Sequence, residues 1–538
     1  MNNTVKTLLF VILLLLVCLF VDYKQIFDIP RRLENRPIIY ELVYYINYIG
    51  LLVSCLIFFT IRSKVIRVVF CLLFFITLSV TLAVALAHGN SFSKIEANIL
   101  FTEIQFAGEA TNTFLFQYLE AIGIAMVITA LVAFIAYKFM PRLDSLYALI
   151  PLLFIAYSIK INYSSKGWHT LFPSVFNVPI VAADAYFSTP RFGPRKPPFI
   201  KPEKKGLFKH IVWIIDESVR ADLLSINDSS MPTTPFLESI KSNYYNYGVM
   251  TSASQYSYGS NIVLQSGLRL DQLPDVNLNF GTNPNIFQYS KQAGYTTYFI
   301  DGQNKEEIPT NGMTRYDFDY IDHYIRIHKS HPDIKWPEVD STIVTYLKNI
   351  LNSKENTFTY INKAGCHFAY NHFYPKTGEV FKPSYHDGES WTDPAMLKNT
   401  YCNCIVWDVD NFFRKLYPAT VDKDAIIIYT SDHGVSLLEQ GRPVQDTSPL
   451  NPLPVRAAVP FLIFAGKEHP ELFQFAADNK NRLSHFSIFP GTLFLLGYNQ
   501  NQISQLYGES FFAKWEKAQR TFFSGTIYDP QNCYLNKF

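Results

Sequence analysis

Residues Ala425–Gly434 read AIIIYTSDHG, an apolar run that ends in a carboxylate and an imidazole. The uncharged, isoleucine-rich run predicts a buried β-strand over Ala425–Tyr429. Gly434 lets the chain turn after the strand, so Asp432 and His433 stand together at its carboxyl end. A carboxylate and an imidazole placed in this way can bind one metal ion, although a purely structural use of the pair is also open.

Four more short runs typical of β-strands occur before and after this stretch. They predict strands over His210–Ile215, Thr296–Ile300, Thr357–Ile361 and Val459–Phe464. Helical patterns lie between the strands, over Asn285–Gln292, Asp340–Leu351 and Thr400–Tyr417. Strands that alternate with helices predict an α/β domain built on a mostly parallel sheet.

Polar residues directly follow three of the predicted strands: Asp216-Glu217, Cys366-His367 and Asp432-His433. In sheets of this class, sites form beyond the carboxyl ends of the strands, so we expect these residues to meet there. Glu217, Asp432 and His433 together offer one nitrogen and several oxygen donors, which suit Zn²⁺ or Mn²⁺. Glu217 could instead serve as a negative charge at a helix N-terminus.

The segment Thr251–Ser260 reads TSASQYSYGS and is rich in hydroxyl groups. A metal-bound hydroxyl loses its proton more readily than a free one, as metal-bound water does, and can then attack phosphorus without a separate base. A serine of this segment could therefore be both a fourth ligand and the nucleophile. Serine-rich stretches are also typical of ordinary loops.

The excess of apolar residues lies before about residue 160. Hydrophobic residues make up 49% of the chain and charged residues 17%, against roughly 25% charged in average usage. Five runs are candidates to cross the membrane as helices: Val5–Val21, Ile38–Thr60, Val65–Ala87, Tyr118–Tyr137 and Leu146–Ile161. Lysines and arginines in alternate short loops place the N-terminus in the cytoplasm, although Arg31, Arg32 and Arg36 oppose this orientation. An odd number of spans then places the chain after Ile161 outside the cytoplasm.

Two connecting segments could meet the membrane surface. The loop His88–Gln117, which contains Glu109, is either a solvated loop or an interfacial segment that contributes to a substrate cleft. Thr189–Lys205 reads TPRFGPRKPPFIKPEKK, too rich in proline for a helix or a central strand. It predicts a semi-rigid linker, either a simple spacer or a cationic segment against anionic headgroups. The expected domains are a transmembrane domain over 1–163, a linker with an interfacial helix over 164–205, and an extracytoplasmic domain over 206–538.

Four motifs resemble those of the sulfatase-fold phosphoethanolamine and phosphoglycerol transferases of bacterial envelopes. They are YTSDHGVSLLEQG at Tyr429–Gly441, IIDESVRADLLS at Ile214–Ser225, GCHFAYNHFYP at Gly365–Pro375 and GYTTYFIDGQN at Gly294–Asn304. They occur in the family's order, and the resemblance covers nearly the whole chain. It is closest to the phosphoethanolamine transferases that modify lipid A and related glycolipids.

The resemblance implies an alkaline-phosphatase/sulfatase-like catalytic domain with zinc bound by Glu217, Asp432 and His433. The family nucleophile is a threonine in a segment resembling T-A-x-S-x-P-C, and that pattern places Ser254 in its position, as nucleophile and metal ligand, with Ser257 as the other candidate. His367 would hydrogen-bond the transferred phosphoryl group and stabilise its charge. Further substrate contacts are expected from Glu109 and His485.

The sequence departs from the family pattern in three places. The segment after the SDHG motif, Gly441–Arg456, lacks the histidine that the family often has there. The cysteines that often flank the family nucleophile are missing, and serine replaces the expected threonine. Four cysteines lie outside the predicted spans, at Cys366, Cys402, Cys404 and Cys533, and their disulfide pairing stays open.

The expected function is a transferase of the bacterial inner membrane whose catalytic domain lies in the periplasm. It would move phosphoethanolamine from a phospholipid, such as phosphatidylethanolamine, to an envelope glycan or lipid through a covalent serine intermediate. A phosphoglycerol transferase of the same fold and a catalytically impaired relative are the alternatives. A sulfatase proper would need a C/S-x-P/A-x-R signature, which Ser254–Tyr258 lacks. The net charge of +2 gives no argument for a nucleic-acid partner, and we expect a monomer.

Overall fold

A computed structural model describes most of the chain: residues 3–33, 39–88, 115–164, 192–227, 230–304, 311–387, 391–442, 451–465, 469–530 and 532–538, with a few single residues and short helical pieces between them. The chain divides into two compact units, Met1–Thr189 and Pro190–Phe538. The division falls inside the predicted linker. Glu109, most of the loop around it and most of the predicted interfacial helix lie outside the described residues.

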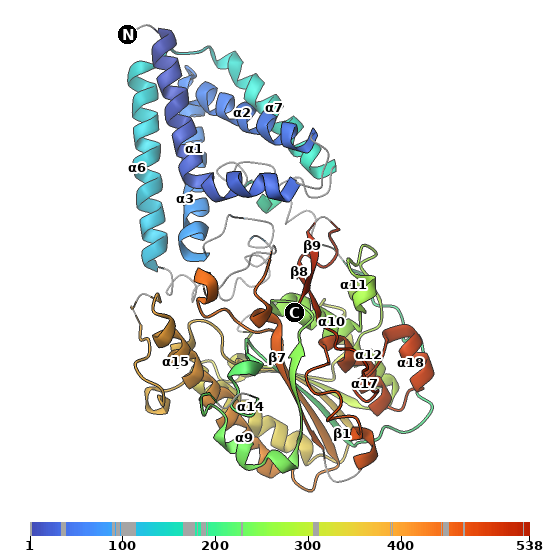
Figure 1. The fold of residues 1–538 in the computed structure, drawn as a ribbon. Helices are drawn as coiled ribbons and strands as arrows, with labels where there is room; N and C mark the ends of the chain where they lie inside the picture. The colour runs from blue at the N-terminus through green and yellow to red at the C-terminus, as the bar shows by residue number, and fades with distance from the viewer. Residues whose placement is uncertain are drawn as a thin grey trace. The chain divides into compact units, whose positions relative to one another are not determined.

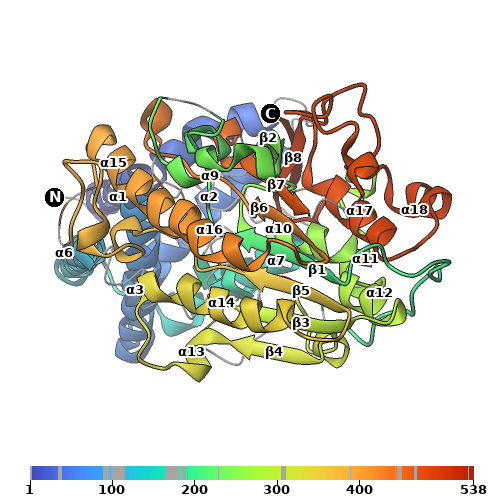
Figure 2. The ribbon, with the colours of Figure 1, turned by 90° about the horizontal axis from the view of Figure 1, so that it is seen from below.

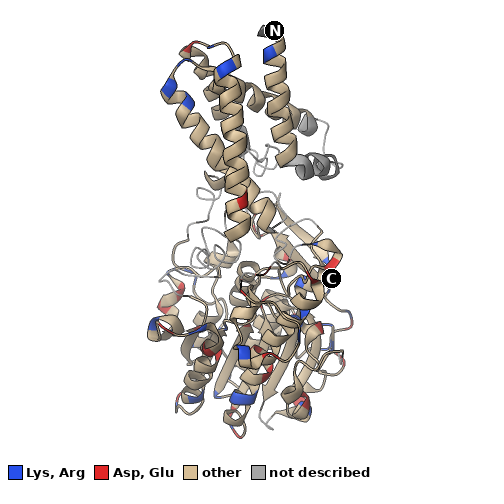
Figure 3. Ribbon diagram, turned by 90° about the vertical axis from the view of Figure 1, so that its left-hand side faces the viewer, with Lys and Arg blue, Asp and Glu red and all other residues tan. Residues whose placement is uncertain are grey.

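The first unit consists of helices (Figure 1), and the apolar stretches that Figure 3 colours contain few charged residues. The helices are α1 (Asn3–Leu33), α2 (Ile39–Thr60), α3 (Lys64–His88), α6 (Leu115–Phe139) and α7 (Leu149–Ser164). The first four contain stretches long and apolar enough to cross a membrane, and they coincide with four of the predicted spans. The fifth predicted span falls on α7 and the 3₁₀ turn before it, where the apolar helical segment is shorter. A five-span topology therefore stays a prediction.

Small residues on α6 let the helices of this unit pack closely. Ala121, Ala125, Val132 and Ala136 are buried there, spaced so that they share one face of the helix. They pack in one apolar cluster with residues of α3 such as Leu78. Small side chains at such a contact allow two helices to approach each other, which favours association in a lipid environment.

The second unit is built on a seven-stranded sheet in the order β2-β7-β6-β1-β5-β3-β4. Its strands are β1 (His210–Asp216), β2 (Tyr245–Thr251), β3 (Thr296–Asp301), β4 (His323–Arg326), β5 (Thr357–Asn362), β6 (Ala425–Ser431) and β7 (Ala458–Ala465). The strands from β6 through β4 pair in parallel, whereas β7 is antiparallel to both β6 and β2. The predicted mostly parallel sheet is confirmed, and β2 and β4 are additions to it.

Helices cover both faces of this sheet (Figures 1 and 2). One group comprises α9 (Pro235–Ser239), α14 (Trp336–Leu351), α15 (Pro394–Ile405) and α16 (Asn411–Leu416), with a π-helical turn over Val406–Asp410 that joins α15 to α16. The other comprises α10 (Ser257–Ser266), α12 (Ile286–Gln292), α17 (Ile488–Leu495) and α18 (Gln500–Tyr507). A short hairpin of β8 (Thr521–Gly525) and β9 (Cys533–Lys537) lies outside the main sheet. Every residue of β1 is buried, as expected of a strand covered on both faces.

The second half of the predicted linker is part of the second unit. The guanidinium of Arg195 pairs with Asp317, and both side chains are buried. Its Nη1 also donates to the carbonyl of Phe280 at 2.7 Å. This arginine is therefore held by the protein and does not face lipid headgroups.

A buried ion pair joins the carboxyl ends of the central strands. Lys363, directly after β5, donates from Nζ to Asp216 Oδ2 at 2.7 Å and to the carbonyl of Asp408 at 2.6 Å. Its Nζ also lies 3.4 Å from Asp340 Oδ2 on α14. The hydroxyl of Tyr429 on β6 donates to the same Asp216 oxygen at 2.8 Å. The carboxyl ends of β1, β5 and β6 are thus linked to one another and to α14.

Replacement of Lys363 by methionine should destabilise the protein strongly. The substitution removes the cation and leaves Asp216 buried without its partner, which typically costs about 3–5 kcal/mol. Denaturant unfolding followed by tryptophan fluorescence would measure the change in the free energy of unfolding. The exposed Lys354→Met is the matched control, expected to change it by less than about 0.5 kcal/mol. Equal effects of the two substitutions would contradict the role given to Lys363.

Candidate active site

Two strand ends bring Glu217, Asp432 and His433 together. Glu217 follows β1, and Asp432 and His433 follow the neighbouring strand β6. All three are buried, and one potential ligand atom from each lies within 4.8 Å of the others. The His433 Nε2 atom is 3.6 Å from Glu217 Oε1 and 3.7 Å from Asp432 Oδ2. The structure thus places the three predicted ligands around one point.

The hydrogen bonds of Asp432 leave one of its oxygens available to a cation. Asp432 Oδ1 accepts the main-chain N–H groups of Ser218 at 2.9 Å and His433 at 2.6 Å. Asp432 Oδ2 is buried and accepts no hydrogen bond from the described residues. A buried carboxylate oxygen without a donor is unfavourable, and contact with a cation would satisfy it.

The protonation of His433 also suits a metal ligand. Its Nδ1 atom lies 2.7 Å from the carbonyl of Gly434, and because a carbonyl only accepts, Nδ1 carries the proton. The Nε2 lone pair then faces the two carboxylates. Burial lowers the pKa of His433, which keeps the imidazole neutral. A donor set of one imidazole nitrogen and carboxylate oxygens fits zinc.

The hydroxyl that reaches this cluster belongs to Ser257. It is the first residue of α10, and its Oγ donates to Glu217 Oε2 at 3.2 Å and lies 3.3 Å from His433 Nε2. Ser254 is fully buried, and its main-chain N–H and carbonyl both bond the Ser260 hydroxyl, at 3.1 and 3.2 Å. Among the described residues, no hydrogen bond joins the Ser254 hydroxyl to the cluster. The geometry therefore favours Ser257, the second candidate, over Ser254.

Gln303 is a contact of the cluster that the sequence alone did not indicate. It follows β3, and its Nε2 donates to Glu217 Oε2 at 3.0 Å and to the carbonyl of Lys363 at 2.8 Å. The residue lies within the quoted motif GYTTYFIDGQN, and this membership was the only indication in the sequence that it could belong to the site. Gln303 fixes the orientation of the Glu217 carboxylate.

His367 lies near the cluster, in the loop that follows β5. Its ring is half-buried, and Nδ1 is 2.7 Å from the carbonyl of Phe368. Its charge is among the causes that lower the pKa of His433, after burial. The position is compatible with the predicted contact to a substrate, and that role stays a prediction.

His485 occupies a position different from the one expected of a substrate contact. Its side chain is fully buried, and both ring nitrogens meet the main chain. Nδ1 accepts the N–H of Ala253 at 3.2 Å, so Nε2 carries the proton and donates to the carbonyl of Ser431 at 2.9 Å. His485 therefore connects the loop before α10 to the end of β6, directly before Asp432.

A second ion pair joins two of the quoted motifs. The guanidinium of Arg220 pairs with Glu439, which comes eight residues after Ser431 in the motif Tyr429–Gly441. It also pairs with Asp222 at 2.6 Å. The arginine is buried whereas its partners are partly exposed. This pair holds the segment after His433 against the segment after Glu217.

The burial of His485 predicts a loss of stability in acid. Burial lowers the pKa of His485 to about 4, from 6.5. Between these values the unfolded chain binds a proton that the folded chain does not, so stability falls as the pH falls from about 6.5 to about 4, by about 3 kcal/mol. His485→Asn cannot take up this proton, and its unfolding free energy should depend less on pH in that window. The exposed His331→Asn is the control, and its unfolding free energy should vary with pH as that of wild type does. The same pH dependence in both variants would contradict the role given to His485.

Comparisons with known proteins identify the family of this domain. The sequence profile of the Sulfatase family matches residues 209–498. The Kdo(2)-lipid A phosphoethanolamine 7''-transferases of Salmonella typhimurium and Escherichia coli are 26% identical over 318 residues and 27% identical over 302 residues. These matches cover 56% and 54% of this chain, and 54% and 52% of the relatives. The chain thus spans about half the length of the curated relatives it matches.

Solved structures show the same fold. The integral membrane lipooligosaccharide phosphoethanolamine transferase A from Neisseria meningitidis superposes with a TM-score of 0.60 at 18% identity, over 82% of this chain and 86% of that one. The soluble domain of that protein gives a TM-score of 0.50 at 20% identity, over 58% of this chain and 95% of that one. The predicted architecture, apolar helices followed by an alkaline-phosphatase/sulfatase-like domain, is confirmed. Because the family profile covers more than half of its residues, the chain belongs to the sulfatase family.

Proposed function

We propose that this protein is a metal-dependent phosphoethanolamine transferase that acts on a membrane phospholipid and an envelope glycan or lipid acceptor. One observation carries the proposal: the Ser257 hydroxyl contacts Glu217 and His433 inside a buried cluster of carboxylates and imidazole. A nucleophilic hydroxyl beside such a donor set fits covalent phosphoryl transfer. The names of the curated relatives, which are phosphoethanolamine transferases of Kdo(2)-lipid A, support the transferred group and the class of acceptor.

Zinc is the metal that the residues fit best. Glu217, Asp432 and His433 would hold it, and the Zn complex of the periplasmic domain of Escherichia coli EptC, which has a TM-score of 0.51 at 17% identity, is a protein of the same fold. When bound, zinc would supply the positive charge that favours the ionised form of the Ser257 hydroxyl. Manganese remains compatible with the oxygen donors.

The chain's own residues account for the remaining requirements of the reaction. Ser257 Oγ attacks the headgroup phosphorus, and its proton passes through Glu217 Oε2 to the glycerol oxygen as the bond from phosphorus to that oxygen breaks, so that diacylglycerol leaves as a neutral alcohol. A hydroxyl of the acceptor then attacks the phosphorus of the phosphoserine, the bond from phosphorus to the Ser257 oxygen breaks, and the acceptor's proton passes through Glu217 to that oxygen, which restores the Ser257 hydroxyl. Because Ser257 begins α10, the unpaired N–H groups of the first helical turn would stabilise a phosphoryl group bound to this serine. His367 would add a hydrogen bond to the same group.

The apolar helices give the proposed reaction access to its donor. A transferase that takes its headgroup from a phospholipid needs to work at the bilayer surface, and α1, α2, α3 and α6 are each long enough to anchor it there. We place the protein in the bacterial inner membrane with the second unit in the periplasm. The acceptor would then be a glycolipid or glycan of the envelope.

The nucleophile should be revealed by a covalent adduct. Full-length protein in detergent, incubated with phosphatidylethanolamine, should gain the mass of one phosphoethanolamine in intact-mass spectrometry. Ser257→Ala should lose this adduct, whereas Ser254→Ala should retain it because the Ser254 hydroxyl does not contact the cluster. Loss in Ser254→Ala alone would return the nucleophile to that residue. An adduct formed only from phosphatidylglycerol would keep the mechanism and indicate a phosphoglycerol transferase.

Removal of the metal should abolish adduct formation, and loss of the Gln303 amide should weaken metal binding. Residues that orient a metal ligand typically change affinity by about 10–100-fold when replaced. Gln303→Met should therefore raise, by such a factor, the free zinc concentration that restores half of the adduct after chelation. The exposed Gln292→Met is the control and should behave as wild type. Adduct formation that survives complete chelation would contradict metal dependence.

A further inference from the structure

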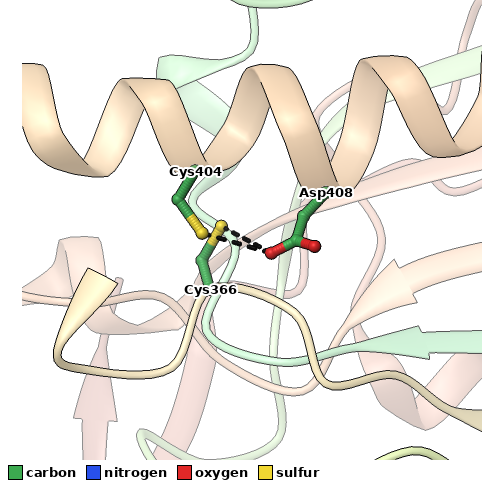
Figure 4. A group of neighbouring side chains, drawn as sticks. All are labelled: Cys366, Cys404 and Asp408. Atoms are coloured by element: carbon green, nitrogen blue, oxygen red, sulfur yellow. Dashed lines mark hydrogen bonds between the residues drawn. The ribbon is translucent and has the colours of Figure 1, made fainter. Parts of the chain in front are cut away.

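A second group of potential metal ligands lies in the catalytic domain, separate from the first. It consists of Cys366 in the loop after β5, Cys404 on α15 and Asp408 in the π-helical turn (Figure 4). One ligand atom from each lies within 4.8 Å of the others, and all three side chains are buried. Figure 4 shows the two sulfurs and a carboxylate oxygen pointing toward one another.

The spacing of these atoms suits a tetrahedral ion. Asp408 Oδ2 lies 3.1 Å from Cys404 Sγ and 3.6 Å from Cys366 Sγ. With Zn–S near 2.3 Å and Zn–O near 2.0–2.2 Å, neighbouring ligand atoms of a tetrahedral site lie roughly 3.5–3.8 Å apart. The carbonyl of Gly365, 3.9 Å from Cys404 Sγ, is a further oxygen beside the group. Small movements would place all four atoms around one ion.

Local structure explains why these side chains converge. Cys404 and Asp408 are four residues apart, a spacing that places two side chains on the same side of a helix. The π-helical turn begins between them, and such turns often mark functional sites. Cys366 is held in place from the other side, since its main-chain N–H donates to the carbonyl of Glu217 at 2.9 Å.

The chemistry of the group selects a soft ion. Thiolates favour zinc or copper(I) over magnesium, calcium or manganese. Burial raises the pKa of the Cys404 thiol and of the Asp408 carboxyl. A divalent ion binds the thiols in their deprotonated form, and with two thiolates and one carboxylate around it the group would carry a net charge of −1. A disulfide would instead deprive the Asp408 carboxylate of both thiol donors.

We propose that Cys366, Cys404 and Asp408 bind a structural zinc ion, with the Gly365 carbonyl as the nearest further donor. This ion would tie α15 to the loop that carries His367. Through the main-chain contact of Cys366, it would also fix the segment that carries Glu217. The domain would then hold two zinc ions of different character, one bound by nitrogen and oxygen and one bound mainly by sulfur.

Cobalt substitution of the full-length protein in detergent separates the two sites. Cobalt bound to thiolates gives an intense near-ultraviolet charge-transfer absorption, and the first cluster contains no sulfur. Wild type should show this absorption, Asp432→Asn should retain it, and Cys366→Ser should lose it. Cys402→Ser is the matched control and should retain it, because Cys402 is also buried on α15 but its sulfur contacts Met231.

Zinc content gives an independent readout that needs no activity. Elemental analysis should find about one zinc ion fewer per chain in Cys366→Ser than in Cys402→Ser. Absence of the charge-transfer absorption from wild type would overturn the proposal without any variant having to fold. A disulfide between Cys366 and Cys404, detected by mass spectrometry without reduction, would overturn it equally. Neither result would bear on the proposed transferase reaction, which is tested separately by the phosphoethanolamine adduct on Ser257.

Discussion

The buried ammonium group of Lys363 is the constraint on which the catalytic domain depends. A charge without any exposure is tolerated only when partners surround it, and these partners come from β1, α14 and the π-helical turn. Asp216, the partner on β1, also accepts the main-chain N–H of Glu217 at 3.0 Å. The position of the first ligand carboxylate is thus set by an ion pair that takes no part in the proposed chemistry. The Tyr429 hydroxyl extends the same network to the strand that carries Asp432 and His433.

The strands that could be predicted are those with one uniform signal. β1, β6 and β7 are largely apolar runs, β3 and β5 combine threonine with aromatic residues and isoleucine, which favour strands, and each was expected within a residue or two of its observed bounds. β2 reads YNYGVMT, in which polar residues and a glycine interrupt the pattern, and β4 has only four residues. Neither contains enough consecutive apolar residues to be recognised alone. Both are strands because neighbouring strands supply the hydrogen bonds that their own sequences do not indicate.

Some residues of the site could be predicted from the sequence, and others could not. Glu217, Asp432 and His433 follow predicted strands directly, so the topology of a parallel sheet was enough to bring them together. The choice between Ser254 and Ser257 depends on where α10 begins, and residue identity does not fix a helix start to within three positions. Gln303 reaches Glu217 from a third strand end, which only the folded chain reveals. His485 was expected from its resemblance to a family position, and nothing in the sequence indicated that both of its ring nitrogens would meet main-chain groups.

The assembly of the cluster from distant parts of the chain has a consequence for biosynthesis. Glu217 and Ser257 are made early, whereas Asp432 and His433 follow only after about two hundred more residues and the addition of β3, β4 and β5. Until β6 is inserted beside β1, no competent centre exists. A polypeptide still emerging from the ribosome, or one shortened by proteolysis before β6, would carry Ser257 and Glu217 but neither Asp432 nor His433. The proposed reaction with phospholipids would therefore wait until β6 has been made and has joined the sheet.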